Sequence, residues 1–219
     1  MTASLWLLDL RPIAFDAMRA LLSAEEHARA QRYKVRGDVE RFVKSRGALR
    51  RILGKQTDRD ARALVFLEGG GRKPELRDHP SLHFNLSHSG DYALIAVGSQ
   101  PLGVDIEAIR PDVDWQGLAK MNFHPDERAT LEARPDAAIR TFFQIWAHKE
   151  AFLKAIGIGF TDQLTSIAVP PEGGMISAPK FLSPRSWHAT PLDSPPGYAA
   201  SIVSGTRPTL RRVTTSLAV

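Results

Sequence analysis

Apolar and polar positions change their spacing along the chain, and each spacing predicts one type of element. From residue 23 to 53 the apolar side chains recur with a helical period that is interrupted near Gly37. Ser23 followed by Glu26 matches a capping box, and Asp38 is the expected cap of a second helix. We therefore expect two consecutive helices in this stretch.

Short strands are expected next. The segment ALVFLEGGGRKPEL predicts a short strand that ends in a glycine-rich turn and Pro74. The following segment contains three apolar runs, which end near Leu86, extend over 92–97 and begin at Leu102. Because turn residues separate these runs, the pattern predicts a β-meander of three strands.

The third run, LGVDIE, alternates between apolar and acidic positions. Leu102, Val104 and Ile106 share one face of the expected strand, and Asp105 and Glu107 share the other. Two carboxylates at this spacing lie roughly 7 Å apart at the backbone and repel each other unless a cation lies between them. The alternation therefore raises the question of which cation these acids hold.

The second half of the chain repeats the order of helices followed by strands. Pro125 is expected early in a helix, with Glu127 near its positive end. The strongest helical pattern extends from about 136 to 156 and ends at Gly157. Beyond residue 160, apolar runs such as GYAASIV alternate with prolines and predict antiparallel strands.

This repetition predicts the fold class. GDYALIAV and GYAASIV could be equivalent strands, which favours an α+β fold of two similar halves. We place the boundary between the halves so that they cover residues 1–101 and 102–219.

Composition excludes some classes of chemistry and location. The chain has no cysteine, so disulfides, thiolate metal sites and a cysteine nucleophile are ruled out. The start, MTASLWLLDLRPIAF, is too short and too charged in its apolar patch for a signal peptide or membrane span. We therefore expect a cytoplasmic protein that does not enter the membrane.

Positive charge is concentrated in the first quarter of the chain. Residues 1–55 hold 12 Lys or Arg against 6 Asp or Glu, whereas the remainder is nearly balanced. Such a surface favours an anionic partner, although charge alone is more often explained by a solvated helix face. Arg46 lies at the edge of the apolar stripe, where it either extends to solvent or reaches an anion.

The helix IWAHKEAFLKAIG adds a third acid. Trp146, Glu150 and Lys154 recur every four residues and share one face. Taken alone, Glu150 and Lys154 are an ordinary surface pair. Together with Asp105 and Glu107, however, Glu150 would complete an all-oxygen site for Mg²⁺, which commonly serves phosphate chemistry.

Two other readings of the chemistry are weaker. Ser87 and His88 could be a nucleophile and its base, but adjacent strand side chains point apart and the G-x-S-x-G elbow is absent. The arginine-rich segment RAQRYKVRGDVERFVKSRGALRR is compatible with a nucleic-acid-binding module. That second reading leaves the acids unexplained, so we do not expect a nucleic-acid partner.

Three blocks in order, FNLSHSGDYALIAV, PLGVDIE and FFQIWAHKEAFLKAIGIG, closely resemble the signature blocks of 4′-phosphopantetheinyl transferases of the Sfp-like group. GRKP and NFHPDE are similar to two further elements of that group. The resemblance implies a pseudodimer of two α+β halves, expected as a monomer, with coenzyme A and Mg²⁺ bound between the halves. It also implies transfer of 4′-phosphopantetheine to a serine of an apo acyl or peptidyl carrier protein, with release of adenosine 3′,5′-bisphosphate.

The resemblance further implies roles for single residues. Asp105, Glu107 and Glu150 are the implied metal ligands, and Glu150 is also the implied general base. Lys154 would neutralise the pyrophosphate, with Lys149 supporting the same region. The remaining implied coenzyme A contacts are Ser87 and His88 at the phosphates, Lys73 at the nucleotide, and one of Arg29, Arg36, Arg41 and Arg46 at the 3′-phosphate, with Arg41 preferred.

Overall fold

The computed structural model describes residues 2–67, 73–159 and 161–213. The predicted glycine turn and the first two residues of GRKP lie outside these ranges. The helices are α1 (Phe15–Arg19), α2 (Ala24–Ala30), α3 (Arg36–Thr57), α4 (Trp115–Asn122), α5 (Pro125–Ala133) and α6 (Ala138–Ile156), with 3₁₀ helices η1 (Pro135–Ala137) and η2 (Asp162–Ser166). The strands are β1 (Thr2–Asp9), β2 (Phe66–Leu67), β3 (Glu75–Leu76), β4 (His83–Ser89), β5 (Tyr92–Gly98), β6 (Leu102–Ala108), β7 (Gly174–Met175), β8 (His188–Pro191), β9 (Tyr198–Ser204) and β10 (Thr209–Arg212).

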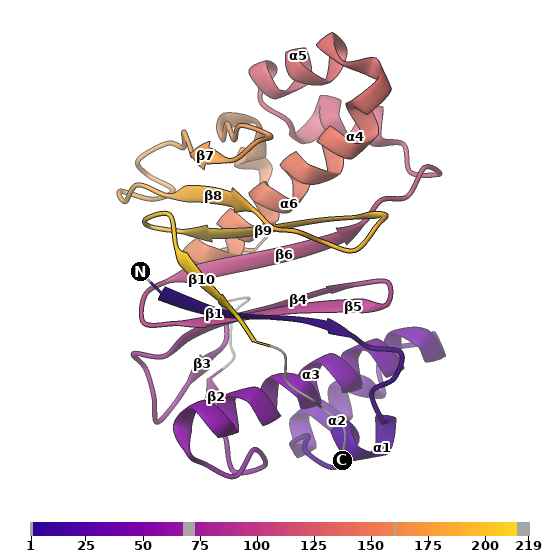
Figure 1. Ribbon diagram of the computed structural model, residues 1–219, viewed down its shortest axis with the longest axis vertical. Coiled ribbons are helices and arrows are strands. Elements are labelled where there is room, and N and C mark those ends of the chain that lie inside the picture. Colours follow the sequence, from indigo (N-terminus) through magenta and orange to yellow (C-terminus); the bar gives the residue numbers. More distant parts are fainter. Residues whose placement is uncertain (1, 68–72, 160, 214–219) are drawn as a thin grey trace.

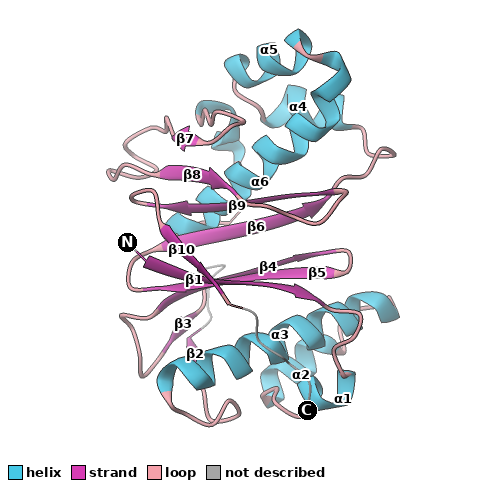
Figure 2. Cartoon of the chain, viewed as in Figure 1, coloured by secondary structure: helices cyan, strands magenta, loops and turns pink. Residues whose placement is uncertain are grey.

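Two four-stranded sheets form the centre of the molecule. The first has the strand order β10-β1-β5-β4 and the second has the order β6-β9-β8-β7, while β2 and β3 form a separate hairpin. Figure 1 shows α1, α2 and α3 on the outer side of the first sheet and α4, α5 and α6 on the outer side of the second. Figure 2 shows the same layers by type, with strands enclosed between helices. The fold is therefore the predicted α+β arrangement of two similar halves.

The alternating pattern of the strands explains how the sheets pack. Ala3 and Leu5 of β1, Leu94 of β5 and Val104 of β6 belong to one buried apolar cluster, which lies between the sheets. The intervening positions of β1 and β5, such as Trp6 and others of the same face, pack against the helices of the first half. Because successive strand side chains point to opposite faces, each sheet contributes to two cores.

The predicted alternation of β6 is confirmed. Leu102, Val104 and Ile106 are buried between the sheets, whereas Asp105 turns to the other face and bonds Lys154 of α6. The acidic face of β6 thus looks toward the helix that carries the third acid.

Gly103 brings α6 against β6. A Cβ atom at this position would lie 2.0 Å from the carbonyl oxygen of Ala151 and 2.5 Å from the backbone nitrogen of Ala155. No side chain fits at such distances, so the glycine permits the backbone of α6 to touch the strand. This contact sets the distance between the acids of β6 and the polar side chains of α6.

Several predicted boundaries are correct. Ser23 and Glu26 form both bonds of the capping box at the start of α2. Pro125 opens α5, and α6 ends at Gly157, whose φ of 77° is a left-handed conformation that favours glycine.

Other sequence-based expectations are wrong. The helix break does lie near Gly37, but α3 begins at Arg36 with Val35, and not Asp38, as its N-cap, and Val35 offers no side-chain bond. Asp38 is therefore not a cap and pairs with Arg41 inside the first turn. The meander is also incorrect: β4 and β5 form a hairpin, but β6 leaves that sheet and pairs with β9.

The last described strand returns to the first half. β10 pairs with β1 in parallel, with Thr209 opposite Thr2. The division into residues 1–101 and 102–219 stays a prediction, and this strand crosses it. Within the described residues we find no helix that combines a bilayer-spanning length with a sufficiently apolar composition.

Candidate active site

The two halves meet where β4 and β6, each the edge strand of its sheet, face one another; we call this contact the seam. Alternate side chains of β4 cross it. Asn85 Oδ1 accepts from the backbone N–H of Val104 at 2.8 Å, and Ser87 Oγ donates to Asp105 Oδ1 at 2.6 Å. Polar side chains thus take the place of the backbone ladder that two edge strands would otherwise form.

Asp105 lies at the centre of the seam and is 2% exposed. Its Oδ1 accepts from Ser87 and, at 2.5 Å, from Lys154 Nζ. Its Oδ2 is buried and has no hydrogen-bond partner among the described residues. A buried carboxylate oxygen without a partner is costly, and it marks a position where a ligand would be stabilised.

Glu107 and Glu150 share the electrostatic environment of Asp105. Burial and the charge of Asp105 raise the pKa of Glu107 to about 7. The pKa of Glu150 is raised by the same two causes in the same order. A charge that raises the pKa of two other carboxyl groups lies close to both, so Asp105, Glu107 and Glu150, hereafter the three acids, form one negatively charged site.

Lys154 supplies the positive charge of the site. It lies one helical turn after Glu150 on α6 and also donates to Ser87 Oγ at 3.0 Å. Burial alone would lower its pKa, but the charges of the three acids raise the pKa of Lys154 above its usual value. The ammonium therefore stays charged beside the acids, and the side chain as a whole is 28% exposed.

The donor set of the three acids fits a hard divalent cation, although the side chains are not yet arranged around one. Within the described ranges, no group of three or more His, Asp or Glu side chains is positioned to hold a metal ion as it stands. The unpartnered Oδ2 of Asp105 nevertheless offers a free oxygen ligand, and Mg²⁺ prefers carboxylate oxygens. The predicted metal site is compatible with these residues and stays a prediction.

A cationic pocket lies on the other side of β4. A pocket of about 200 Å³ is lined by Arg29, Arg46 and His88, with Tyr33, Phe42 and Pro74 among its other walls. Desolvation lowers the pKa of His88, and the positive charges of Lys154, Arg41 and Arg29 lower it further. His88 thus stands between the cation of the seam and the arginines of the first half.

A larger pocket adjoins it. This pocket, of about 870 Å³, shares Arg29, Phe42 and Arg46 with the smaller one and adds Arg32 and Arg62. The concentration of guanidinium groups would attract an anionic ligand.

Arg46 has a different role from the two considered for it. Its side chain is buried and pairs with Glu26, which also accepts from Arg50 Nε at 2.5 Å. The guanidinium of Arg46 lies 4.3 Å from the centre of the Phe66 ring. Burial is the largest influence and opposes ionisation of Glu26, but the charge and hydrogen bond of Arg46, together with the bonds from Ser23 and Arg50, hold the pKa of Glu26 below its usual value. The two arginines thus reach a carboxylate inside the protein.

The structure places the other predicted coenzyme A contacts as follows. Lys73 is half-buried and donates to the backbone carbonyl of Leu102 at the start of β6, and burial lowers its pKa to about 8. Arg41 donates to Asp38 at 2.6 Å and remains partly exposed. Arg36 is exposed and pairs with Glu40.

The described partner carboxylate of Lys149 is Glu127 and not one of the three acids, and the implied support of Lys149 for the phosphate region stays a prediction. Lys149 is 1% exposed, and its ammonium lies 2.9 Å from Glu127 Oε2. It also donates to the carbonyl oxygens of Leu164 at 2.8 Å and Ile167 at 2.6 Å. All of these partners lie on α5 or near η2, so Lys149 is a structural cation.

Some residues of this site were missed by the sequence patterns. Ser89 and Asn85 cross the seam, and their alternation with apolar residues of β4 was the available signal. Gly103 was detectable as a glycine inside a strand pattern. His148 is fully buried with Nδ1 2.7 Å from Ser201 Oγ, and burial lowers its pKa to about 4.

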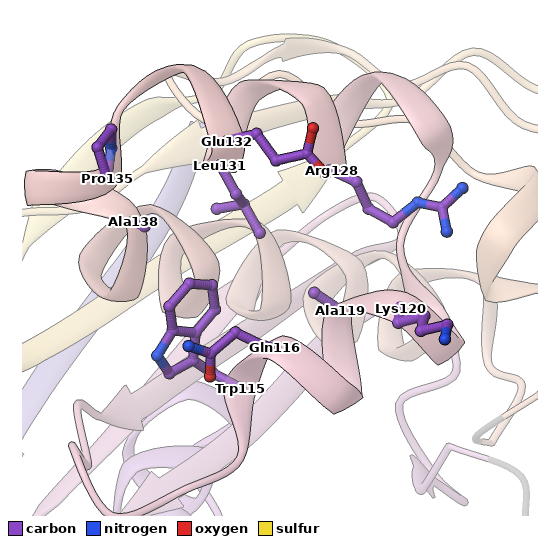
Figure 3. A pocket seen from close by; sticks show the side chains of 9 residues that line it. All are labelled: Trp115, Gln116, Ala119, Lys120, Arg128, Leu131, Glu132, Pro135 and Ala138. Carbon is purple, nitrogen blue, oxygen red and sulfur yellow. The ribbon is translucent and has the colours of Figure 1, made fainter.

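A further pocket, of about 580 Å³, lies between α4, α5 and the start of α6. Figure 3 shows Trp115 and Leu131 on its apolar walls, with Lys120 and Arg128 together at one end. None of the predicted site residues lines it. The charged chemistry is therefore concentrated at the seam.

Comparison with known proteins identifies the family. Residues 101–203 match the 4′-phosphopantetheinyl transferase superfamily, and residues 11–100 match the N-terminal region of a 4′-phosphopantetheinyl transferase. The chain is 34% identical over 156 residues to a 4′-phosphopantetheinyl transferase of Bacillus subtilis, covering 70% of this chain and 68% of the relative.

Two other relatives agree. The 4′-phosphopantetheinyl transferase psf-1 of Bacillus pumilus is 35% identical over 152 residues, covering 69% of this chain and 64% of the relative. The 4′-phosphopantetheinyl transferase Sfp of Bacillus subtilis strain 168 is 29% identical over 189 residues, covering 85% and 84%. The chain therefore belongs to the 4′-phosphopantetheinyl transferase family and is an enzyme of that class.

Proposed function

We propose that this enzyme transfers 4′-phosphopantetheine from coenzyme A to a serine of an apo acyl or peptidyl carrier protein in a Mg²⁺-dependent reaction. The observation that carries the proposal is the pairing of Lys154 with Asp105, whose second oxygen is buried without a described partner. A cation and a free carboxylate oxygen at one point suit a reaction in which a charged phosphate bridge is broken.

Asp105, Glu107 and Glu150 would hold the Mg²⁺ ion. When bound, the ion neutralises phosphate charge as it develops on the leaving group. The mutual repulsion of the three acids, seen in the raised pKa values of Glu107 and Glu150, is what a divalent cation would relieve.

The protein residues then have separate tasks. Glu150 accepts the proton of the carrier serine while the serine oxygen bonds to the phosphorus next to pantetheine. The bond from that phosphorus to the bridging oxygen breaks, and adenosine 3′,5′-bisphosphate leaves with both electrons. Lys154 donates to the phosphate oxygens that gain charge, and its contact with Ser87 keeps it near the seam.

The cationic pocket beside β4 would receive the nucleotide. Arg29 and Arg41 act electrostatically on His88, so these three residues lie where the phosphates of coenzyme A could be held. We propose Ser87 and His88 for the phosphates nearest the seam. Of the four arginines considered for the 3′-phosphate, we retain Arg29 beside Arg41, because Arg29 lines both pockets.

The carrier protein would approach the basic first half. The exposed Arg32 lies just beyond α2 and lines the larger pocket. An acidic helix of the carrier is complementary to this surface. A single chain already contains both halves of the seam, so we propose that the enzyme acts as a monomer.

The test is a mass measurement on the carrier. Incubation with coenzyme A, Mg²⁺ and a panel of apo carrier proteins should add the mass of phosphopantetheine, and a chelator should abolish the addition. A carrier whose acceptor serine is replaced by alanine is the control and should not change. If no carrier gains mass while DNA or RNA binds with a steep salt dependence, the nucleic-acid-binding reading replaces this one.

A further inference from the structure

The seam contains a third polar contact that differs from the other two. Ser89, the last residue of β4, accepts from the backbone N–H of Ala108 at 3.0 Å. The same hydroxyl donates to Glu107 Oε2 at 3.1 Å. Ser89 therefore bonds the strand and the carboxylate that the strand carries at the same time.

These two hydrogen bonds fix the direction of the Ser89 hydroxyl proton. A serine hydroxyl has one proton to donate and rotates freely unless its acceptor side is occupied. Because the N–H of Ala108 occupies the oxygen of Ser89, the proton points to Glu107. The carboxylate of Glu107 is thus held by a hydroxyl from the opposite half of the molecule.

Asn85 and Ser87, the other two residues of β4 whose side chains cross the seam, have different partners from Ser89. Among the described contacts of the seam, the Asn85 side chain accepts a hydrogen bond from the backbone N–H of Val104. This contact fixes the position of β6 relative to β4. Ser87 is shared between Asp105 and Lys154, and it is already proposed as a phosphate contact. Ser89 is left as the residue that orients Glu107.

We infer that Ser89 is a positioning residue, which holds the carboxylate of Glu107 in the orientation that binds the metal ion. The inference rests on the proposed function of the three acids. Groups that hydrogen-bond a metal ligand typically contribute about 10–100-fold to metal affinity, because they remove the entropy of orienting the ligand. One half of the molecule would then tune the metal affinity of the other.

The test compares Ser89→Ala with Ser89→Thr. Calorimetric titration of Mg²⁺ into the enzyme with saturating coenzyme A and no carrier should show affinity about tenfold lower for Ser89→Ala. Ser89→Thr keeps the hydroxyl and should restore the affinity. In turnover, Ser89→Ala should recover its rate at high Mg²⁺ with an unchanged KM for coenzyme A, which a general loss of structure would not produce.

A matched control is Ser194→Ala, because the Ser194 hydroxyl bonds a backbone carbonyl, that of Tyr198, and none of the three acids. It should leave Mg²⁺ affinity unchanged. Thermal unfolding of each variant identifies any that fails to fold. If Ser89→Ala does not fold, the Mg²⁺ affinity of Ser89→Thr is the test. Weak Mg²⁺ binding by a folded Ser89→Thr, which keeps the hydroxyl, contradicts the inference.

The outcomes separate this inference from the proposed function. If the wild-type enzyme with coenzyme A binds no Mg²⁺, the metal assignment of the three acids fails. If the wild type binds Mg²⁺ and folded Ser89→Ala binds it equally well, the role of Ser89 alone is overturned.

Discussion

Two lysines five residues apart on α6 have different surroundings, although each ammonium pairs with a carboxylate. Lys149 is buried, and its ammonium has Glu127 and two carbonyl oxygens as partners. Lys154 contacts Asp105 and Ser87, keeps part of its side chain exposed, and faces an oxygen without a described partner. The difference is that the carboxylate paired with Lys149 has hydrogen-bond partners on both oxygens, whereas one oxygen of Asp105, the partner of Lys154, has none among the described residues.

Completeness has an energetic meaning. A buried ion pair recovers its desolvation cost only when hydrogen bonds satisfy both ions, as they do for Glu127, which also accepts from Val169 and His124. Burial also raises the pKa of Glu127, where the charge of Lys149 opposes the rise. At Glu107 and Glu150, burial and the like charge of Asp105 both raise the pKa. Strain of this kind is typical of functional sites.

The largest effect should come from Glu150→Gln. An amide cannot accept the serine proton, so turnover should fall by roughly 10²–10⁴-fold. Stability toward denaturant should stay level or rise, because one of three repelling charges is removed. Carrier modification by mass spectrometry and denaturant unfolding measure the two effects, and wild-type turnover in this variant would exclude Glu150 from the chemistry.

Glu127→Gln, the same replacement at the partner of Lys149, should lower stability and leave turnover largely intact. Glu127→Gln leaves Lys149 charged and buried without its counterion, so the free energy of unfolding should fall by about 3–5 kcal/mol. Turnover per folded molecule should change much less than in Glu150→Gln. If Glu127→Gln unfolds like the wild type, the contrast between the two lysines is wrong.

An intermediate effect on stability and turnover is expected from Gly103→Ala, which should displace α6 from β6. Gly103→Ala forces a methyl group against the backbone of Ala151 and should destabilise the fold by about 1–3 kcal/mol. It should also reduce turnover, because α6 carries both Glu150 and Lys154. Gly159→Ala is the control, since a Cβ there meets nothing within 4 Å; equal effects of the two variants would mean that the close contact is not the cause.

The smallest effect concerns the approach of the carrier. Exposed charge pairs are worth about 0.2–1 kcal/mol, so Arg32→Glu should raise the KM for the carrier by up to about fivefold. The effect should shrink as salt is added. Arg140→Glu, an equal change at an exposed residue of α6, should leave KM unchanged; a fall in kcat alone for Arg32→Glu would place carrier docking elsewhere.

Local patterns predicted much of the fold. The Ser23–Glu26 capping box, the start of α5 at Pro125 and the end of α6 at Gly157 follow from short-range chemistry. The alternation of β6 predicted which face holds the acids. These features depend on neighbours within one turn or one strand, which the sequence displays directly.

Long-range partners could not be predicted in the same way. Nothing local indicates that β6 pairs with β9 rather than β5, or that Lys149 turns toward Glu127 while Glu150 turns toward Asp105. Adjacent helix residues point about 100° apart, so one side chain of a Lys-Glu pair can be structural and the next chemical. The site roles of individual residues therefore remain proposals that rest on geometry and on the tests above.

The parallel pairing of β10 with β1 has a consequence for how the protein is made. β1 is translated before β10, so one edge of β1 stays uncovered until β10 has been made. The nascent chain must therefore shield an open strand edge, which is prone to aggregation, until synthesis has passed the second half. The first sheet is thus completed only after the second half has been translated.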